Sequence, residues 1–267
     1  MTALRSIRTH TLAAVLCAAA LLAGCALRQA GPKPEAASEP RAVRPLGAIL
    51  EERNRALQSL RGLARISYRA AGKRRAFNAA VLVRRPHRLR LEAFSLVGAA
   101  LILTVDDDEV TGFLPSEARF YRARTSRQNL FRATELLLEL EEMVALMMGL
   151  PPVRSGAAWS ADGSVLRRTR AGGGTDVLTF DAQIQAPVRW QRFGPSGKPW
   201  YVATFEDFTD TSAGPFPLKI TLETPPLRRS YEIRYDEPEL NVTLPESHFV
   251  QELPEGVVRI PLPTPTG

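Results

Sequence analysis

The stretch that decides the fold is Arg88-Leu89-Arg90-Leu91-Glu92-Ala93. Polar and apolar side chains alternate along it without exception, which is the pattern of a β-strand with one face in water and the other against a core. The same two-residue period recurs on both sides, interrupted by short turn sequences such as Ala71-Gly72-Lys73 and Gly172-Gly173-Gly174. Because short turns join antiparallel strands, the sequence predicts a mainly β protein with a large antiparallel sheet.

The alternating segments predict about eleven or twelve strands. With about 240 residues after a predicted leader, the chain is long enough for one large β domain. The strands are expected at residues 63–70, 77–85, 88–93, 101–105, 109–114, 118–123, 164–170, 175–181, 187–193, 199–208, 217–224 and 229–236.

Two segments change to helical spacing. In residues 46–60, leucine and isoleucine side chains recur three, four and seven positions apart, which predicts an amphipathic helix. Residues 130–150 predict a second, more apolar helix, ended by Gly149 and by the two prolines that follow Leu150. A helix this apolar between two runs of strands either packs directly on the sheet or covers a cavity, where its methionines would give an adaptable lining.

The amino terminus has the organisation of a secretory signal. Arg5 and Arg8 precede an apolar run that ends in Leu22-Ala23-Gly24-Cys25. The run is too short to span a bilayer. The cysteine after Ala-Gly resembles the bacterial lipobox, which implies a signal peptide over residues 1–24 and lipid attachment at Cys25. Ala26 in the next position resembles an outer-membrane address, so we expect a lipid-anchored protein on the periplasmic face of the outer membrane.

The positive charge lies near the predicted anchor. From Arg28 to Arg75, twelve Lys and Arg residues face four Asp and Glu residues, whereas the whole chain has a formal net charge of +7. The sequence pI is about 9.9, but secretion and the lack of a recognition motif argue against nucleic acid. The basic segment is expected either to meet anionic phospholipid headgroups or to be a solvated charge run without a partner. Residues 25–45, rich in proline and alanine, are expected to be a disordered tether.

The chemistry of catalysis is not apparent. Cys17 lies in the predicted leader, so Cys25 is the single cysteine of the mature chain. The histidines that remain, His87 and His248, each stand alone in the sequence, and Asp106-Asp107-Asp108 lacks the spacing of a calcium loop. No nucleophile elbow, HExxH or Walker pattern occurs. We therefore expect no enzyme, no cofactor and no metal site.

Two stretches resemble the LolA/LolB superfamily of lipoprotein carriers, with the outer-membrane acceptor LolB the most similar. Residues 88–103 resemble the LolB stretch in which a strand ends, an Asn-Pro-Leu-Gly-type loop protrudes and the next strand begins. Met148-Gly149-Leu150-Pro151 resembles the LGLP that ends the family's central helix. The loop here reads Ser95-Leu96-Val97-Gly98, so the family's exposed leucine corresponds to Val97, or to Leu96 if the register slips by one.

The resemblance implies an open, strongly curved antiparallel sheet, a half-barrel over residues 46–250, with helices covering its concave face and an extended proline-rich tail over 251–267. It implies a membrane-insertion loop at Phe94, Leu96 and Val97. The residues alone leave open whether 94–105 is instead one buried strand. It also implies a cavity for acyl chains, for which we expect the lining Leu91, Leu103, Phe120, Leu137, Leu140, Val144, Met147, Trp190, Tyr201 and Phe205.

The function implied is non-catalytic. The protein would receive an acylated lipoprotein cargo from a periplasmic LolA-like carrier and help to insert it into the outer membrane, and we expect a monomer that contacts membrane phospholipid through acylated Cys25. The alternative is a structural or interaction lipoprotein of the cell envelope that uses the same fold as a partner-binding module. The first hypothesis predicts an apolar cavity under the 130–150 helix, and the second predicts a filled core with an exposed patch elsewhere.

Overall fold

The computed structural model of the protein describes residues 45–153 and 158–262. The predicted signal peptide, the lipid attachment site Cys25 and almost all of the predicted tether lie outside these residues. Of the described residues, 53% are in strands and 17% in helices, so the predicted mainly β class is confirmed. The helices are α2 (Leu46–Ala56), α3 (Arg127–Thr134), α4 (Leu140–Met147) and the short 3-10 turns η1 (Pro115–Glu117), η2 (Pro225–Leu227) and η3 (Glu246–Phe249).

All fourteen strands of the described residues belong to one sheet. They are β1 (Ser59–Ala70), β2 (Lys73–Arg84), β3 (Arg88–Ser95), β4 (Gly98–Val105), β5 (Glu109–Leu114), β6 (Arg119–Arg124), β7 (Ser160–Asp162), β8 (Val165–Thr169), β9 (Thr175–Asp181), β10 (Ala186–Phe193), β11 (Pro199–Thr211), β12 (Gly214–Thr224), β13 (Arg229–Leu240) and β14 (Val258–Ile260). Their spatial order is β14-β6-β5-β4-β3-β2-β1-β13-β12-β11-β10-β9-β8-β7. The prediction of about eleven strands was too low, partly because β7 and β14 have three residues each, too few to show a period.

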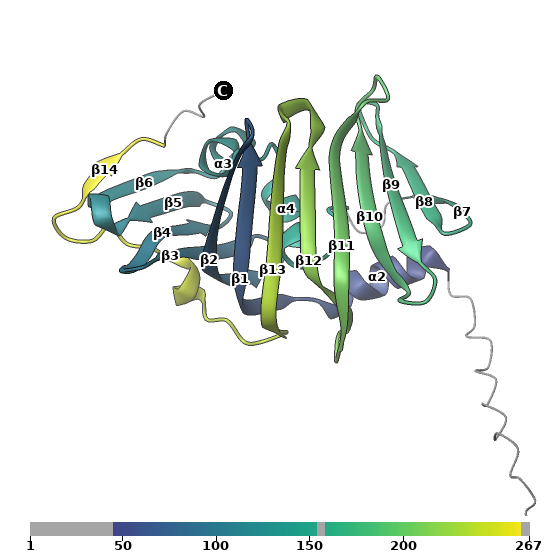
Figure 1. The fold of residues 1–267 in the computed structure, drawn as a ribbon, viewed down its shortest axis with the longest axis horizontal. Coiled ribbons are helices and arrows are strands. Elements are labelled where there is room, and N and C mark those ends of the chain that lie inside the picture. Colours follow the sequence, from purple (N-terminus) through teal and green to yellow (C-terminus); the bar gives the residue numbers. More distant parts are fainter. Residues whose placement is uncertain (1–44, 154–157, 263–267) are drawn as a thin grey trace, which may run out of the picture. The chain divides into compact units, whose positions relative to one another are not determined.

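The order shows two antiparallel meanders, β1 to β6 and β7 to β13, joined in the middle of the sheet. The join is the pairing of β1 with β13, in which Ile66 lies opposite Ile233. The sheet is open, with β14 at one edge and β7 at the other. Strand direction turns strongly across it, from β13 and β1 to β5 and β6 (Figure 1), as expected from the right-handed twist of strands.

The connection between the meanders covers one face of the sheet. Because β6 and β7 lie near opposite edges, the chain between them must travel across the sheet. We call residues 125–153 the crossing segment; it contains α3 and α4, which lie behind the sheet in Figure 1. We call the sheet face that it covers the inner face, and the opposite one the outer face.

The predicted 130–150 helix is in fact two helices. The hydroxyl of Ser126 accepts a hydrogen bond from the amide of Asn129, so α3 begins three residues earlier than predicted, at Arg127. It ends at Glu135, which has a left-handed φ of 60°. The second helix starts at a capping box formed by Glu139 and Glu142. The other predicted helix, 46–60, was also too long, because Ser59 already belongs to β1.

Alternation along the strands separates a core from a wet surface. On β1, Leu60, Ala64 and Ile66 are buried on the inner face, while Arg61 and Leu63 are exposed on the outer face. The largest fully buried side chains of this core include Trp190, Phe205, Phe216, Leu138, Met148, Leu150 and Leu178. Burial of each such side chain contributes about 1.5–3 kcal/mol, so the crossing segment is held mainly by apolar packing.

The carboxyl-terminal segment covers part of the outer face. We call residues 241–260 the strap; its η3 turn lies in front of the sheet in Figure 1, opposite the helices. Arg84 donates to the main-chain oxygen of Leu244 at 2.9 Å, and Arg122 donates to that of Gln251 at 3.0 Å. The strap ends in β14, which pairs in parallel with β6. Three residues of the predicted tail, Val258–Ile260, thus form an edge strand of the sheet.

Candidate functional site

The inner face brings together most of the residues predicted to line a cavity. Leu103, Leu140, Val144, Trp190, Tyr201 and Phe205 are buried in one apolar cluster, and Leu91 and Met147 pack against it half-buried. Leu137 belongs to the link between α3 and α4 and is 41% exposed. Apolar residues from strands β3, β4, β10 and β11 thus meet α4, as the predicted lining requires.

Phe120 is not part of this cluster. It lies opposite Phe113 on β5, whose neighbour two positions back, Thr111, bonds to Gln251 of the strap. Phe120 is therefore on the outer face, fully buried, with the Arg122 guanidinium 5.4 Å from its ring centre. Its assignment to the cavity was wrong. Phe120 points to the outer face, which would be exposed to solvent if the strap, distant in sequence, did not cover it.

The space between α4 and the sheet is filled by side chains. Val144 of the helix, Met148 just after it, and Trp190 and Phe205 of the sheet have at most 1% exposure. Protein atoms therefore surround each of them. Trp190 stacks on Tyr201 with ring centres 6.1 Å apart. For an acyl chain to lie on this face, part of the crossing segment must move away from it.

Tyrosine hydroxyls of the inner face fasten the crossing segment through its main chain. Tyr201 donates to the main-chain oxygen of Leu137 at 3.0 Å, and Tyr231 to that of Glu135 at 3.3 Å. Tyr68 also bonds to the carboxylate of Glu135. Burial raises the pKa of each of these tyrosines above its usual value, so the hydroxyls remain protonated donors. No local sequence pattern marks these contacts, since each of these tyrosines occupies an ordinary strand position.

A buried ionic cluster fastens the first turn of α4. Asp176 is fully buried and accepts from Arg168 Nη2 at 2.7 Å and from Arg192 Nε at 3.0 Å. Arg192 also lies 2.7 Å from the carboxylate of Glu142 on α4. Burial alone would lower the pKa of Arg192, but Glu142 and Asp176 raise it above the usual value. The cluster satisfies its own charges and thereby fixes α4 against β9 and β10.

The predicted membrane-insertion residues lie at the tip of the β3–β4 hairpin. Leu96 and Val97 form the turn and are fully exposed, and Phe94 is 38% exposed. Gly98 has a φ of 123°, and the Ser95 hydroxyl donates to its main-chain oxygen at 2.9 Å. The alternative of one buried strand from 94 to 105 is wrong, because the chain reverses here. Two large apolar side chains are thus presented to solvent side by side.

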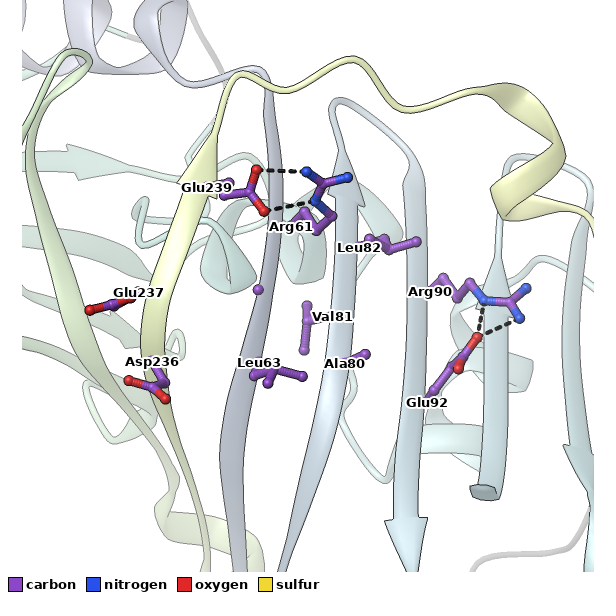
Figure 2. A pocket seen from close by; sticks show the side chains of 11 residues that line it. Arg61, Leu63, Ala80, Val81, Leu82, Arg90, Glu92, Asp236, Glu237 and Glu239 are labelled. Atoms are coloured by element: carbon purple, nitrogen blue, oxygen red, sulfur yellow. Dashed lines mark hydrogen bonds and ion pairs between the residues drawn. The ribbon is translucent and has the colours of Figure 1, made fainter. Parts of the chain in front are cut away.

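The outer face carries a groove of about 550 Å³ beside the strap. Figure 2 shows its floor, formed by Leu63, Ala80 and Leu82 of β1 and β2. Ion pairs border it, Arg61 with Glu239 at 2.6 Å and Arg90 with Glu92 at 2.6 Å. Leu63 is 57% exposed within it. The groove is open and shallow, and sequence reasoning did not identify it.

The described residues show no converging catalytic groups. No cluster of three or more His, Cys, Asp or Glu side chains within them could hold a metal ion. His87 pairs with Asp107 at 2.6 Å on the surface, and His248 lies in the strap. In the same part of the chain, no helix has the length and apolar character needed to cross a membrane.

Comparison with known proteins gives a fold but no close relative. No known family profile matches the sequence, and no curated protein does. A domain described as an outer membrane lipoprotein-sorting protein from Vibrio parahaemolyticus superposes with a TM-score of 0.54 at 13% identity, covering 76% of this chain and 95% of that one. A DUF1329 family protein from Desulfovibrio piger gives 0.53 at 13% identity, covering 78% and 98%.

A LolA superfamily protein from Nitrosomonas europaea gives a TM-score of 0.50 at 12% identity, covering 78% of this chain and 99% of that one. The three structures are covered almost completely, so the shared part is their whole fold. The chain therefore has the fold of LolA-like lipoprotein-sorting domains. At these identities the likeness extends to the fold alone.

Proposed function

We propose that the protein is a lipid-anchored carrier that holds the acyl chains of lipoproteins on its inner face and releases them into the outer membrane. The observation that carries the proposal is the way the inner face is covered. Two short helices and an irregular link lie on a wide apolar surface. They are held there by apolar packing and by a few polar contacts, and not by strand pairing. Such a cover can leave and return without disturbing the strand ladder.

Three further features support this function. The fold is that of lipoprotein-sorting and LolA superfamily domains. The β3–β4 hairpin exposes Leu96 and Val97 to solvent, as expected of side chains that insert into a bilayer. Lipid attachment at Cys25 would place the protein on the membrane that receives the cargo. Transfer needs no covalent chemistry, only an apolar surface that binds acyl chains better than the donor does.

The test is uptake of an acylated cargo. The full chain with Cys25→Ser, which removes the predicted acylation site, is mixed with a triacylated lipoprotein bound to a LolA-like carrier, and the two proteins are then separated. We expect the cargo to move to this chain. Cargo that stays entirely on the donor, at protein concentrations where the folded chain is in excess, would exclude the carrier function.

A second candidate is an interaction lipoprotein that uses the same fold to bind a protein partner. The filled inner face and the groove of Figure 2 favour it. The uptake assay separates the two functions, because an interaction module has no reason to open its inner face. In that case the cargo remains on the donor while the chain stays folded.

A further inference from the structure

Arg53 is a buried cation without a counter-ion among the described residues. It lies on α2, is only 5% exposed, and donates from Nη1 to the main-chain oxygen of Pro215 at 2.6 Å. Its Nε and Nη2 atoms are buried and have no hydrogen-bond partner within residues 45–153 and 158–262. Burial lowers its pKa to about 10, which still leaves it charged at neutral pH. A buried charge with unmet donors is unfavourable unless something satisfies it.

The two unpartnered nitrogens form one edge of the guanidinium plane, the edge that binds two oxygens at once. The same edge is occupied elsewhere in the chain. Arg61 binds Glu239 through Nε at 2.9 Å and through Nη2 at 2.6 Å. Arg168 uses Nε and Nη2 for Asp176 at 3.0 and 2.7 Å. The donor set of Arg53 therefore fits a carboxylate or a phosphate.

The position of Arg53 indicates what would carry that anion. Its helix packs against β8 and β10, and Ile49 and Leu50 of the same helix belong to the apolar cluster of the inner face. Pro215, its single partner, lies at the start of β12, next to the fully buried Phe216. An anion that reaches Arg53 thus enters an apolar interior. A small hydrated ion gains little there, whereas the head of an amphiphile brings its own apolar part.

We infer that Arg53 binds the phosphate or carboxylate head of an anionic amphiphile whose acyl chain lies along the inner face. The inference rests on the proposed function, because it requires the inner face to accept acyl chains. It extends that function to a ligand class, the anionic lipids, that differs from the neutral glyceride of an acylated cysteine. Arg53 sets the preference, and the apolar face supplies most of the affinity.

The experiment compares ligands that share a chain and differ in charge. Palmitoyl lysophosphatidate and palmitate are the anionic probes, monopalmitoylglycerol is the neutral probe, and inorganic phosphate is the probe without a chain. Each is titrated into the Cys25→Ser chain and into its Arg53→Met variant. Arg55→Met is the matched control, because Arg55 is an exposed arginine on the same helix.

We expect the chain to prefer the anionic probes to the neutral one by about 10- to 100-fold, the worth of a charge-assisted hydrogen-bonded pair. Arg53→Met should abolish the preference and leave the neutral probe bound, and Arg55→Met should keep it. A preference that survives Arg53→Met would overturn the assignment, as would phosphate binding as tight as that of lysophosphatidate. If no acyl probe binds at all, the proposed carrier function fails instead.

Folding of the variant is checked by its thermal transition. Methionine removes a buried unpaired charge at similar length, so we expect a transition no lower than that of the parent chain. If Arg53→Met does not fold, Arg53→Lys is used in its place. Lysine keeps the charge and loses the two-pronged edge, so the preference should fall without disappearing; an unchanged preference would again overturn the assignment.

Discussion

Tyr235 of β13 donates a 2.7 Å hydrogen bond to the main-chain oxygen of Met147, the last residue of α4. The tyrosine is 6% exposed, and burial raises its pKa well above the usual value, so the hydroxyl stays a donor at any ordinary pH. This bond joins the centre of the sheet to the end of the helix that covers it. Removing this bond therefore tests directly how firmly the crossing segment is held on the sheet.

Tyr235→Phe should lower the free energy of unfolding by about 1–2 kcal/mol, because it leaves a buried carbonyl without its donor. Urea denaturation measures the change. Tyr121→Phe is the control, since the Tyr121 hydroxyl makes no hydrogen bond within the described part of the chain. Equal stability of the two variants would mean that the Tyr235 bond does not hold α4 down.

Asp176→Asn should be far more damaging, with a loss of about 3–5 kcal/mol, because it leaves Arg168 and Arg192 without their shared buried carboxylate. The comparison is Asp207→Asn, which breaks an exposed pair with Arg234 and should change stability by no more than about 1 kcal/mol. Both are read from denaturation midpoints. If Asp176→Asn cost as little as Asp207→Asn, the cluster would not be a fastening point of α4.

Gly149→Ala should destabilise the end of the crossing segment. Gly149 has a φ of +66°, and a Cβ there would lie 2.6 Å from Cγ of Pro217. Backbone strain and overlap together should cost about 2–4 kcal/mol. Gly47→Ala on α2 has no atom within 4 Å of the added carbon and should instead stabilise the protein by about 0.5–1 kcal/mol. Opposite shifts in melting temperature are the expected result.

Leu96→Ser with Val97→Ser should leave stability unchanged, because both side chains are already in solvent. If the hairpin enters the bilayer, the double variant should still take up cargo but deliver it more slowly to liposomes. Leu227→Ser, at an exposed leucine of η2, should deliver as the parent chain does. Equal delivery by all three proteins would remove the hairpin from the mechanism.

Acid should loosen the strap. Hydrogen bonds from Arg84 and Arg88 lower the pKa of Glu246 below its usual 4.5. A lowered carboxyl pKa means stabilisation that is complete above the unfolded-state value and is lost as the pH falls through the folded-state value. The protection factor for hydrogen exchange at the Val258 amide, which donates to the main-chain oxygen of Ala118, should therefore fall below pH 4.5 more in the parent chain than in Glu246→Gln. The same acid response in both proteins would contradict this role.

The sheet was largely predictable because most of its strands show a two-residue period in their own sequence. In β3, Arg88 to Ala93 alternate, and the structure buries Leu89 and exposes none of the predicted inner side chains. The limits came from contacts between distant residues. Glu135 ends α3 in a left-handed conformation although neither glycine nor proline marks the position, and the tyrosines that hold it lie on β1 and β13.

The candidate site was predicted in composition rather than in detail. Trp190, Phe205 and Val144 meet as expected because apolar positions of strands and helix must share one core. Phe120 does not join them. The strap of residues 241–260 covers it on the outer face, and no local sequence pattern predicts that contact. Arg53 was missed for a related reason: in the sequence it is one of several charges on an amphipathic helix, and only the register of α2 on the sheet shows that it is buried.

The pairing of β1 with β13 has a consequence for the order in which the protein assembles. Strands β1 to β6 can form successive hairpins as they are synthesised. The central pairing of β1 with β13, however, cannot form until a strand about 170 residues downstream has been made. Until Arg229–Leu240 arrive, one side of β1 is an open edge with unpaired amides and carbonyls. The interval before this pairing forms is the period in which this chain is most exposed to wrong pairing and most in need of protection by other proteins.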